Sequence, residues 1–524
     1  MRQLLESIPE EMGLTLKKTA FSPNVKERRD YSCAIFTADA RMIAQAAHIP
    51  VHLGSTPLSV RAAIEAGPLE PGDMVLLNDP FRGGTHLPDL TLVAPVFLSE
   101  REKRPIGFVA NRAHHADVGG AAPGSMALAS EIFAEGLRIP PVKLVRAGRI
   151  DADLLALFLA NVRTKEEREG DLRAQIAANA VGARRIRALA ARIGRAALLA
   201  AATEILDYSE RLLRGAIRTW PAGTFSAEDA LDDDGYSTEP LPIRVAIRVG
   251  RGGSVVADFT GTARQTRGGL NANAAVTLSA VLYAVRCAAN REIPMNDGCF
   301  RPVAVVAPEG TVVNARFPAS VAGGNVETSQ RIVDAVFRAL AKALPKVVPA
   351  ASAGTMNNVT LGGVDPRTGR AFTYYETIAG GMGARPGKDG LSAVQTHMTN
   401  TLNTPIEALE SNYPVRVRAY AVRRGSGGAG RSRGGDGVVR AIEALAPIEA
   451  GVLSERRTLP PYGLAGGEPG RPGRNTIVRG GRIAAKEDMP GKFRARLEPG
   501  DILVVATPGG GGHGRARKRT PALR

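Results

Sequence analysis

Five of the seven histidines of this chain lie before residue 116, in less than a quarter of its 524 residues. The five are His48, His52, His86, His114 and His115. Each lies near the end of a predicted strand, where binding and catalytic residues are commonly built. This clustering is the strongest indication of chemistry in the sequence.

Aspartates accompany these histidines at a spacing that suits a metal ion. A divalent metal requires three or four nitrogen or oxygen donors from different segments, and imidazole with carboxylate suits Zn²⁺, Mn²⁺ or Fe²⁺. His86 and Asp89 lie in "GGTHLPD", directly before the apolar run "LTLVAPVF". Further candidate donors are His114, His115 and Asp117 in "NRAHHADVGG" and Asp30 in "KERRDYS". The sequence therefore predicts a divalent metal site.

Each of these residues also has a simpler interpretation when it is considered alone. The His-x-x-Asp spacing is a weak motif, and a single loop histidine is more often a surface or hydrogen-bonded group than a ligand. His48 and His52 in "AHIPVHLGS" are consistent with capping and packing around a turn. The metal prediction depends on the joint pattern.

Two glycine-rich segments are candidate anion sites. "AGGNVETSQ" at 322–330 and "GGGGHG" at 509–514 could bind an anion through backbone N–H groups, the first ahead of a helix that begins near Thr328. Neither matches a P-loop or a strand–GxGxxG–helix unit, so tight turns are favoured and no nucleotide site is predicted. No GxSxG motif is present, and nucleophilic catalysis is not indicated.

Apolar periodicity and turn residues along the chain indicate a mixed α/β, multidomain protein. Residues 1–150 alternate short apolar runs with turn residues, which predicts an N-terminal α/β domain carrying the metal-site motifs. Residues 151–220 repeat apolar residues every three or four positions, which predicts a helical arm of two long helices with Asp151 as its N-cap. Residues 221–414 are expected to form a second α/β domain, and residues 415–524 a β-rich region with a basic tail.

Composition excludes several classes of protein. Hydrophobic residues make up 44% and charged residues 23%, as in ordinary soluble globular proteins. The net charge of +17 invites comparison with nucleic-acid-binding proteins, but the arginines are scattered and the one dense basic run lies at 515–524. Solvated helix faces and a basic tail explain the charge better, so we expect no nucleic-acid partner.

The cysteines and the apolar segments predict a cytoplasmic location. The chain has three widely spaced cysteines, Cys33, Cys287 and Cys299, and no CxxC motif. This spacing favours buried reduced thiols over disulfides or a thiolate metal site. The N-terminal segment has helical periodicity and mixed charge, unlike a signal peptide. The most apolar helical stretch, 196–206, contains Glu204 and is too short to cross a bilayer, so no membrane association is expected.

Long motifs in this chain resemble the hydantoinase B/oxoprolinase family. They include "AFSPNVKERRDYSCAIF", "NDPFRGGTHLPDLTLVAPVF", "NRAHHADVGGAAPGSM", "FTGTARQTRGGLNAN", "TLNTPIEALESNYPV" and "TPGGGGHG". The resemblance covers almost the whole chain, and the length of the motifs makes chance similarity improbable.

The resemblance implies a B-type subunit that works with a separate A-type, ATP-binding subunit in a heterotetramer or larger assembly. Members open cyclic amides such as hydantoins, 5-oxoproline and lactams using ATP, and relatives carboxylate ketones such as acetone or acetophenone. The family's metal ligands correspond here to Asp30, His86, Asp89 and His114. His115 and Asp117 would orient these ligands by hydrogen bonds.

The resemblance also implies a mechanism. The A-type subunit would phosphorylate the carbonyl oxygen of the cyclic amide, because amide resonance makes that carbonyl a poor electrophile. The metal of this chain would then polarise an oxygen or activate water, with His115 or Asp117 as the catalytic proton-transfer group. A ketone carboxylase subunit is the alternative enzyme, and a structural subunit with a merely hydrogen-bonded histidine cluster is the non-enzymatic alternative.

Overall fold

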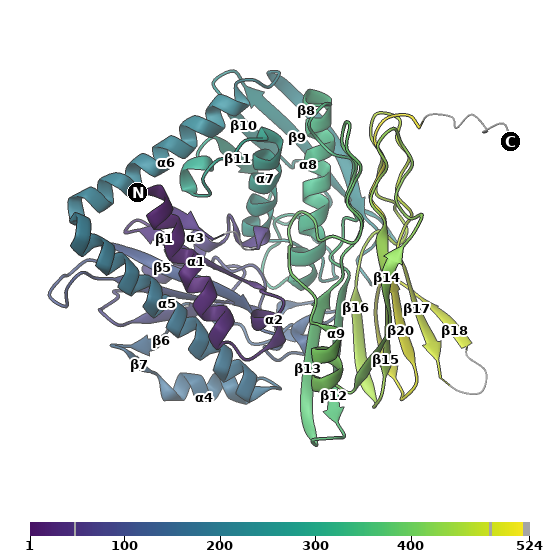
Figure 1. The fold of residues 1–524 in the computed structure, drawn as a ribbon, viewed down its shortest axis with the longest axis horizontal. Helices are drawn as coiled ribbons and strands as arrows, with labels where there is room; N and C mark the ends of the chain where they lie inside the picture. The colour runs from purple at the N-terminus through teal and green to yellow at the C-terminus, as the bar shows by residue number, and fades with distance from the viewer. Residues whose placement is uncertain (47–48, 481–484, 517–524) are drawn as a thin grey trace.

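A seven-stranded antiparallel sheet carries the N-terminal histidine motifs (Figure 1). The structure is a computed structural model that describes residues 1–46, 49–480 and 485–516. The strands in spatial order are β2 (Met42–Gln45), β1 (Tyr31–Thr37), β5 (Gly107–His114), β4 (Asp89–Val96), β3 (Met74–Leu77), β6 (Val142–Arg146) and β7 (Arg149–Ile150). The alternation of apolar runs and turn residues predicted over 1–150 thus corresponds to strands β1 to β7.

Helices cover both faces of this sheet, which explains why its central strands β4 and β5 are buried throughout. On one face, α1 (Arg2–Thr19) and α5 (Lys165–Ile193) bury Met12 and Ala178 against Val109 of β5. On the other face, α3 (Thr56–Glu65) buries Val60 against Phe108. Burial on both faces fixes the register of β4 and β5, because a slip by one residue would exchange the two sets of side chains.

The region 151–220 is helical, as predicted, but it contains three helices where two were expected. They are α4 (Ala152–Ala160), α5, and α6 (Arg195–Ile217). Asp151 is the N-cap of α4, since its carboxylate accepts a hydrogen bond from the Leu154 N–H at 3.0 Å. Gly194, with a φ of +86°, separates α5 from α6.

The middle of the chain forms a four-stranded sheet with two long helices. Its strands in spatial order are β11 (Val303–Val306), β10 (Ser254–Asp258), β9 (Leu241–Gly250) and β8 (Gly223–Leu231). Helices α7 (Ala274–Ala289) and α8 (Ser329–Ala343) share one apolar core with this sheet (Figure 1). Residues Gly324–Thr328 form a π-helical turn that leads into α8, in place of the tight turn expected from "AGGNVETSQ".

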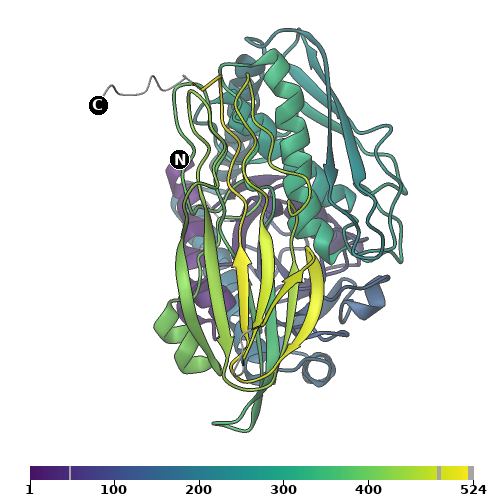
Figure 2. The same ribbon diagram turned by 90° about the vertical axis from the view of Figure 1, so that its right-hand side faces the viewer.

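Two further sheets pack face to face around a C-terminal apolar core (Figure 2). One contains β13 (Arg370–Thr377), β12 (Asn358–Asp365), β16 (Ile448–Leu453) and β19 (Lys492–Leu497). The other contains β14 (Val415–Arg423), β15 (Gly437–Ala444), β20 (Ile502–Ala506), β17 (Arg474–Arg479) and β18 (Ala485–Met489). The domain boundary expected at residue 414 stays a prediction. Strand β12, which precedes this residue, pairs with β16, which follows it.

Glycine-rich segments beyond the sandwich pack backbone against backbone. Gly428 donates a hydrogen bond to the Gly510 carbonyl at 2.9 Å, and Gly512 donates one to the Glu468 carbonyl at 2.9 Å. A Cβ atom at Gly510 would lie 2.1 Å from the Met382 carbonyl oxygen. The run "GGGGHG" is thus required for close lateral packing of neighbouring segments.

The cysteines differ in their exposure. All three cysteines are free, but Cys287 is exposed, so the prediction that all are buried was wrong for this residue, which lies on the outer side of α7. In the described ranges, no helix has both the length and the apolar character needed to cross a membrane.

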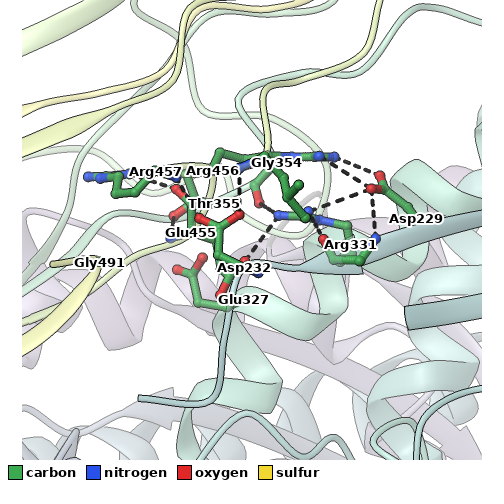
Figure 3. A network of polar contacts seen from close by, with 12 residues as sticks. Asp229, Asp232, Glu327, Arg331, Gly354, Thr355, Glu455, Arg456, Arg457 and Gly491 are labelled. Carbon is green, nitrogen blue, oxygen red and sulfur yellow. Dashed lines mark hydrogen bonds and ion pairs between the residues drawn. The ribbon is translucent and has the colours of Figure 1, made fainter. Parts of the chain in front are cut away.

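A buried network of charges joins the middle sheet to the C-terminal sandwich (Figure 3). Arg456, which follows β16, donates hydrogen bonds to Asp229 of β8 at 2.7 Å and to Asp334 of α8 at 2.8 Å. All three side chains are buried. Arg331 lies 3.3 Å from Glu455 in the same network. Each charged side chain of the network has a partner of opposite charge, so its burial costs less free energy than the burial of an unpaired charge.

Replacing Arg456 with Met should lower the free energy of unfolding by about 3–5 kcal/mol, because Asp229 and Asp334 would then be buried without their cation. Arg474→Met is the matched control: it breaks an exposed pair with Asp488 and should cost less than about 1 kcal/mol. Chemical denaturation of both variants checks this. Equal stability of the two would show that the network contributes nothing.

Candidate metal centre

Strand pairing brings the two main histidine motifs together. Asp89 is the first residue of β4 and lies directly opposite His114, the last residue of β5. His86 lies in the turn just before β4, where the Asp89 N–H donates a hydrogen bond to the His86 carbonyl at 3.1 Å. The metal-site residues therefore meet at one end of two central strands.

His86, Asp89 and His114 form a compact cluster of potential ligands. One donor atom from each lies within 4.8 Å of the others. Asp89 Oδ1 is 3.2 Å from His86 Nε2 and 3.4 Å from His114 Nδ1. The exposed fractions of the three side chains are 0%, 1% and 3% in chain order. Three of the four residues predicted as ligands therefore lie together and could hold a metal ion, and their role as ligands stays a prediction.

Several polar atoms of the cluster are buried without a hydrogen-bond partner. They are both ring nitrogens of His86, Oδ1 of Asp89 and Nε2 of His114. Buried polar atoms are rarely left unsatisfied, because each costs desolvation free energy. A divalent cation would satisfy such a set of imidazole nitrogens and a carboxylate oxygen, so the donor set fits a metal ion.

His52 and Thr85 hold the second carboxylate oxygen of Asp89. Thr85 Oγ1 donates a hydrogen bond to Asp89 Oδ2 at 2.5 Å, and His52 Nε2 lies 3.2 Å from the same oxygen. His52 Nδ1 is in turn 2.8 Å from Ser32 Oγ. Fixing Oδ2 in this way leaves Oδ1 directed at the cluster. Sequence reasoning assigned His52 to turn packing, although its place among the clustered histidines was a usable signal.

An aromatic ring from a distant strand fixes the orientation of His114. Tyr375 of β13 stacks on the His114 ring with centroids 4.6 Å apart and an interplanar angle of 17°. The Arg28 guanidinium lies 4.8 Å from the centre of the Tyr375 ring. The Tyr375 hydroxyl donates a hydrogen bond to Asn358 Oδ1 at 2.8 Å. Nothing in the sequence near residue 375 indicated this contact.

The surroundings of the cluster favour the protonation states in which Asp89 and His114 can bind a metal ion. Burial would raise the pKa of Asp89, but the nearby imidazoles of His86, His52 and His114 hold it well below its ordinary value. Burial lowers the pKa of His114, which favours the neutral imidazole. A carboxylate and a neutral imidazole are the forms that bind metal ions.

Asp30 lies next to the cluster but outside its 4.8 Å limit. Its carbonyl accepts a hydrogen bond from the His114 N–H at 3.0 Å, and its carboxylate is 4.0 Å from the Arg28 guanidinium. The negative charge of Asp30 also raises the pKa of His114, but burial lowers that pKa by more. The structure thus places Asp30 beside the predicted site, and its role as a ligand stays a prediction.

His115 and Asp117 have partners elsewhere. The His115 ring nitrogen Nε2 is 2.9 Å from Gln175 Oε1 of α5, on the opposite face of the sheet from His114, and burial lowers its pKa to about 4. Asp117 accepts hydrogen bonds from Gly119, Gly124 and Arg163. The His115 backbone N–H donates to the Pro88 carbonyl at 2.8 Å. These contacts position the two ligand-bearing segments, whereas proton transfer by either side chain stays a prediction.

Glu135 is a buried carboxyl group that sequence reasoning missed. Its Oε1 accepts hydrogen bonds from Ser320 Oγ and from the backbone N–H groups of Val321 and Ala322, while its buried Oε2 has no partner. Burial raises its pKa to about 7, with an opposing effect from the nearby His86. His48, the remaining clustered histidine, lies outside the described residues.

Curated relatives match nearly all of this chain. It is 43% identical to an uncharacterized protein of Methanocaldococcus jannaschii, over 98% of this chain and 89% of the other. It is 31% identical to a protein of a Pseudomonas species that is named as a D-/L-hydantoinase subunit, over 99% and 89% of the two chains. The 5-oxoprolinase of Dictyostelium discoideum is 38% identical over 97% of this chain, but this chain spans only 39% of that protein's length.

Solved structures share the fold. The ATP-dependent caprolactamase of Pseudomonas jessenii has a TM-score of 0.91 and 32% identity, covering 98% of this chain and 90% of the other. Acetone carboxylase has the same TM-score at 20% identity, covering 99% and 75% of the two chains, which shows likeness of fold alone. The family model for hydantoinase B/oxoprolinase matches residues 1–516. This chain therefore belongs to the hydantoinase B/oxoprolinase family.

Proposed function

We propose that this chain is the B-type subunit of an ATP-dependent cyclic-amide hydrolase of the cytoplasm, with a divalent metal held by His86, Asp89, His114 and Asp30. Its substrate class comprises hydantoins, 5-oxoproline and lactams. Its partner would be an A-type subunit that binds ATP, since no nucleotide motif is present in this sequence. The observation that carries the proposal is the buried cluster of unpartnered imidazole and carboxylate donors.

The relatives support the reaction class. A hydantoinase subunit, several 5-oxoprolinases and an ATP-dependent caprolactamase all act, by their names, on cyclic amides. Hydrolysis of such a ring is opposed by amide resonance, and phosphorylation of the carbonyl oxygen by the partner would remove that resonance. This chain would then complete the opening of the activated ring.

The residues of this chain have separate tasks in the proposed reaction. The cation would supply Lewis-acid polarisation of an oxygen of the substrate. His52 and Thr85 hold Asp89 in one orientation, and Tyr375 holds the His114 ring. His115 and Asp117 position the segments that carry the ligands.

Glu135 is the group we propose for proton transfer. Its Oε2 is buried and unpartnered, and its pKa of about 7 lets it hold or release a proton near neutral pH. Neither His115 nor Asp117 combines these two properties, because His115 has a pKa of about 4 and both oxygens of Asp117 accept hydrogen bonds.

His86→Ala and Asp89→Asn should each lose a nearly stoichiometric divalent metal ion that the purified parent chain retains, because each removes one of three converging donors. Elemental analysis by mass spectrometry measures this. His513→Ala, in the C-terminal glycine-rich segment, is the histidine control and should keep its metal. Equal metal content in all four proteins would rule out the site.

Ring opening should require ATP and the A-type subunit together with this chain. The measurement is the release of the ring-opened acid from hydantoin, 5-oxoproline and caprolactam, with each component omitted in turn. Full activity of this chain without ATP would contradict the division of roles. Formation of a keto acid from acetone and bicarbonate, without ring opening, would support the carboxylase alternative.

Glu135→Gln should lower kcat by about tenfold to a thousandfold while metal content is retained, because Gln keeps the hydrogen-bond acceptor but cannot transfer a proton. The pH dependence is a second readout. Loss of Glu135 should remove the limb of the kcat profile near pH 7, which reports a group with the raised pKa of this carboxyl. An unchanged kcat and profile would exclude Glu135 from proton transfer.

A further inference from the structure

A cavity whose lining includes none of His86, Asp89 and His114 lies between the helices of the middle sheet and the glycine-rich segments. Its volume is about 810 Å³, and its walls come from α7, α8, residues 346–349 and residues 382–400. This volume lies within the range of small-molecule sites. A neighbouring cavity of about 870 Å³ shares Pro50, Tyr283, Cys287 and Asn290 with it.

The charged residues that line this cavity are all basic. Lys346, Arg385 and Lys388 line it, and no Asp or Glu does among the described residues. All three side chains are exposed, and among the described residues none of them forms an ion pair. In the neighbouring cavity, by contrast, Arg2 pairs with Glu6 and Glu292. The 810 Å³ cavity therefore has three unneutralised cations.

The floor of the cavity is aromatic and partly buried. Tyr283 and Phe337 both meet the His397 ring edge to face, with centroids 5.9 and 5.5 Å from it. His397 is only 6% exposed, and its Nε2 lies 3.5 Å from Asp334 Oδ1. Its φ of +60° is a strained value for a residue other than glycine, and such values are concentrated at functional sites.

We propose that this cavity binds a small organic phosphate. Lys346, Arg385 and Lys388 would neutralise the phosphate, because guanidinium and ammonium groups form strong charge-assisted hydrogen bonds with phosphate oxygens. A planar or apolar ring would lie on the floor made by Tyr283, Phe337 and His397. The inference does not depend on the proposed hydrolase activity, since it uses none of the metal-cluster residues.

Binding of three probes to the full chain tests the chemistry. Isothermal titration calorimetry would use phenyl phosphate, AMP and inorganic phosphate at one ionic strength. Phenyl phosphate should bind at least tenfold more tightly than inorganic phosphate, because only the former has a ring. AMP binding as tightly as phenyl phosphate would identify a nucleotide as the source of the phosphate. Exclusion of AMP would identify a smaller phosphorylated ring compound.

A matched pair of charge-reversal variants tests the location. The triple substitution K346E/R385E/K388E should weaken phenyl phosphate binding at least tenfold. The control R101E/K103E/R104E makes the same change of net charge on the exposed loop between β4 and β5, and should change the dissociation constant less than twofold. If the first variant fails to fold, K346Q/R385Q/K388Q makes the same test without reversing charge.

Two results would overturn the proposal. One is the absence of saturable binding of all three probes to the parent chain. The other is an equal loss of affinity in the cavity variant and the loop control, which would show that the net charge of +17 attracts anions without a site.

Discussion

The antiparallel pairing of β4 with β5 is the constraint on which the metal cluster depends. It places the first residue of one strand opposite the last residue of the other, so Asp89 and His114 meet at one sheet end. The apolar layers on both faces of the sheet hold this register. A one-residue slip would turn His114 toward α5 and separate the ligands, so the chemistry of the site relies on ordinary core packing.

Further contacts then fix two of the three candidate ligands. The carboxylate of Asp89 uses one oxygen for His52 and Thr85 and keeps the other for the cluster. The His114 ring is held by Tyr375, a residue of the C-terminal sandwich. The cluster is therefore assembled by two parts of the molecule, the N-terminal sheet and the C-terminal sandwich. The buried charges around Arg456 join that sandwich to the middle sheet.

The glycine-rich segments have a structural role in this assembly. Their close backbone packing forms a wall beside α7 and α8, and Arg385 and Lys388 extend from that wall over the 810 Å³ cavity. The metal cluster is almost fully buried, whereas the cavity has a basic rim at the surface. The ligands that we propose for the two sites therefore differ: a cation for the histidine–aspartate cluster and an organic anion for the cavity.

The sequence alone indicated the strands before residue 115, the helical region after Asp151 and the residues that are candidate metal donors, because these depend on local periodicity and on residue type. It did not reveal His52 as a partner of Asp89, the stacking of Tyr375 or the burial of Glu135. Those contacts join residues far apart in the chain, and only the packing of three sheets brings them together. Tertiary packing also decided which face of the sheet carries the cluster. Because successive side chains at the end of β5 point to opposite faces, His114 enters the cluster and its neighbour His115 contacts Gln175 of α5 instead.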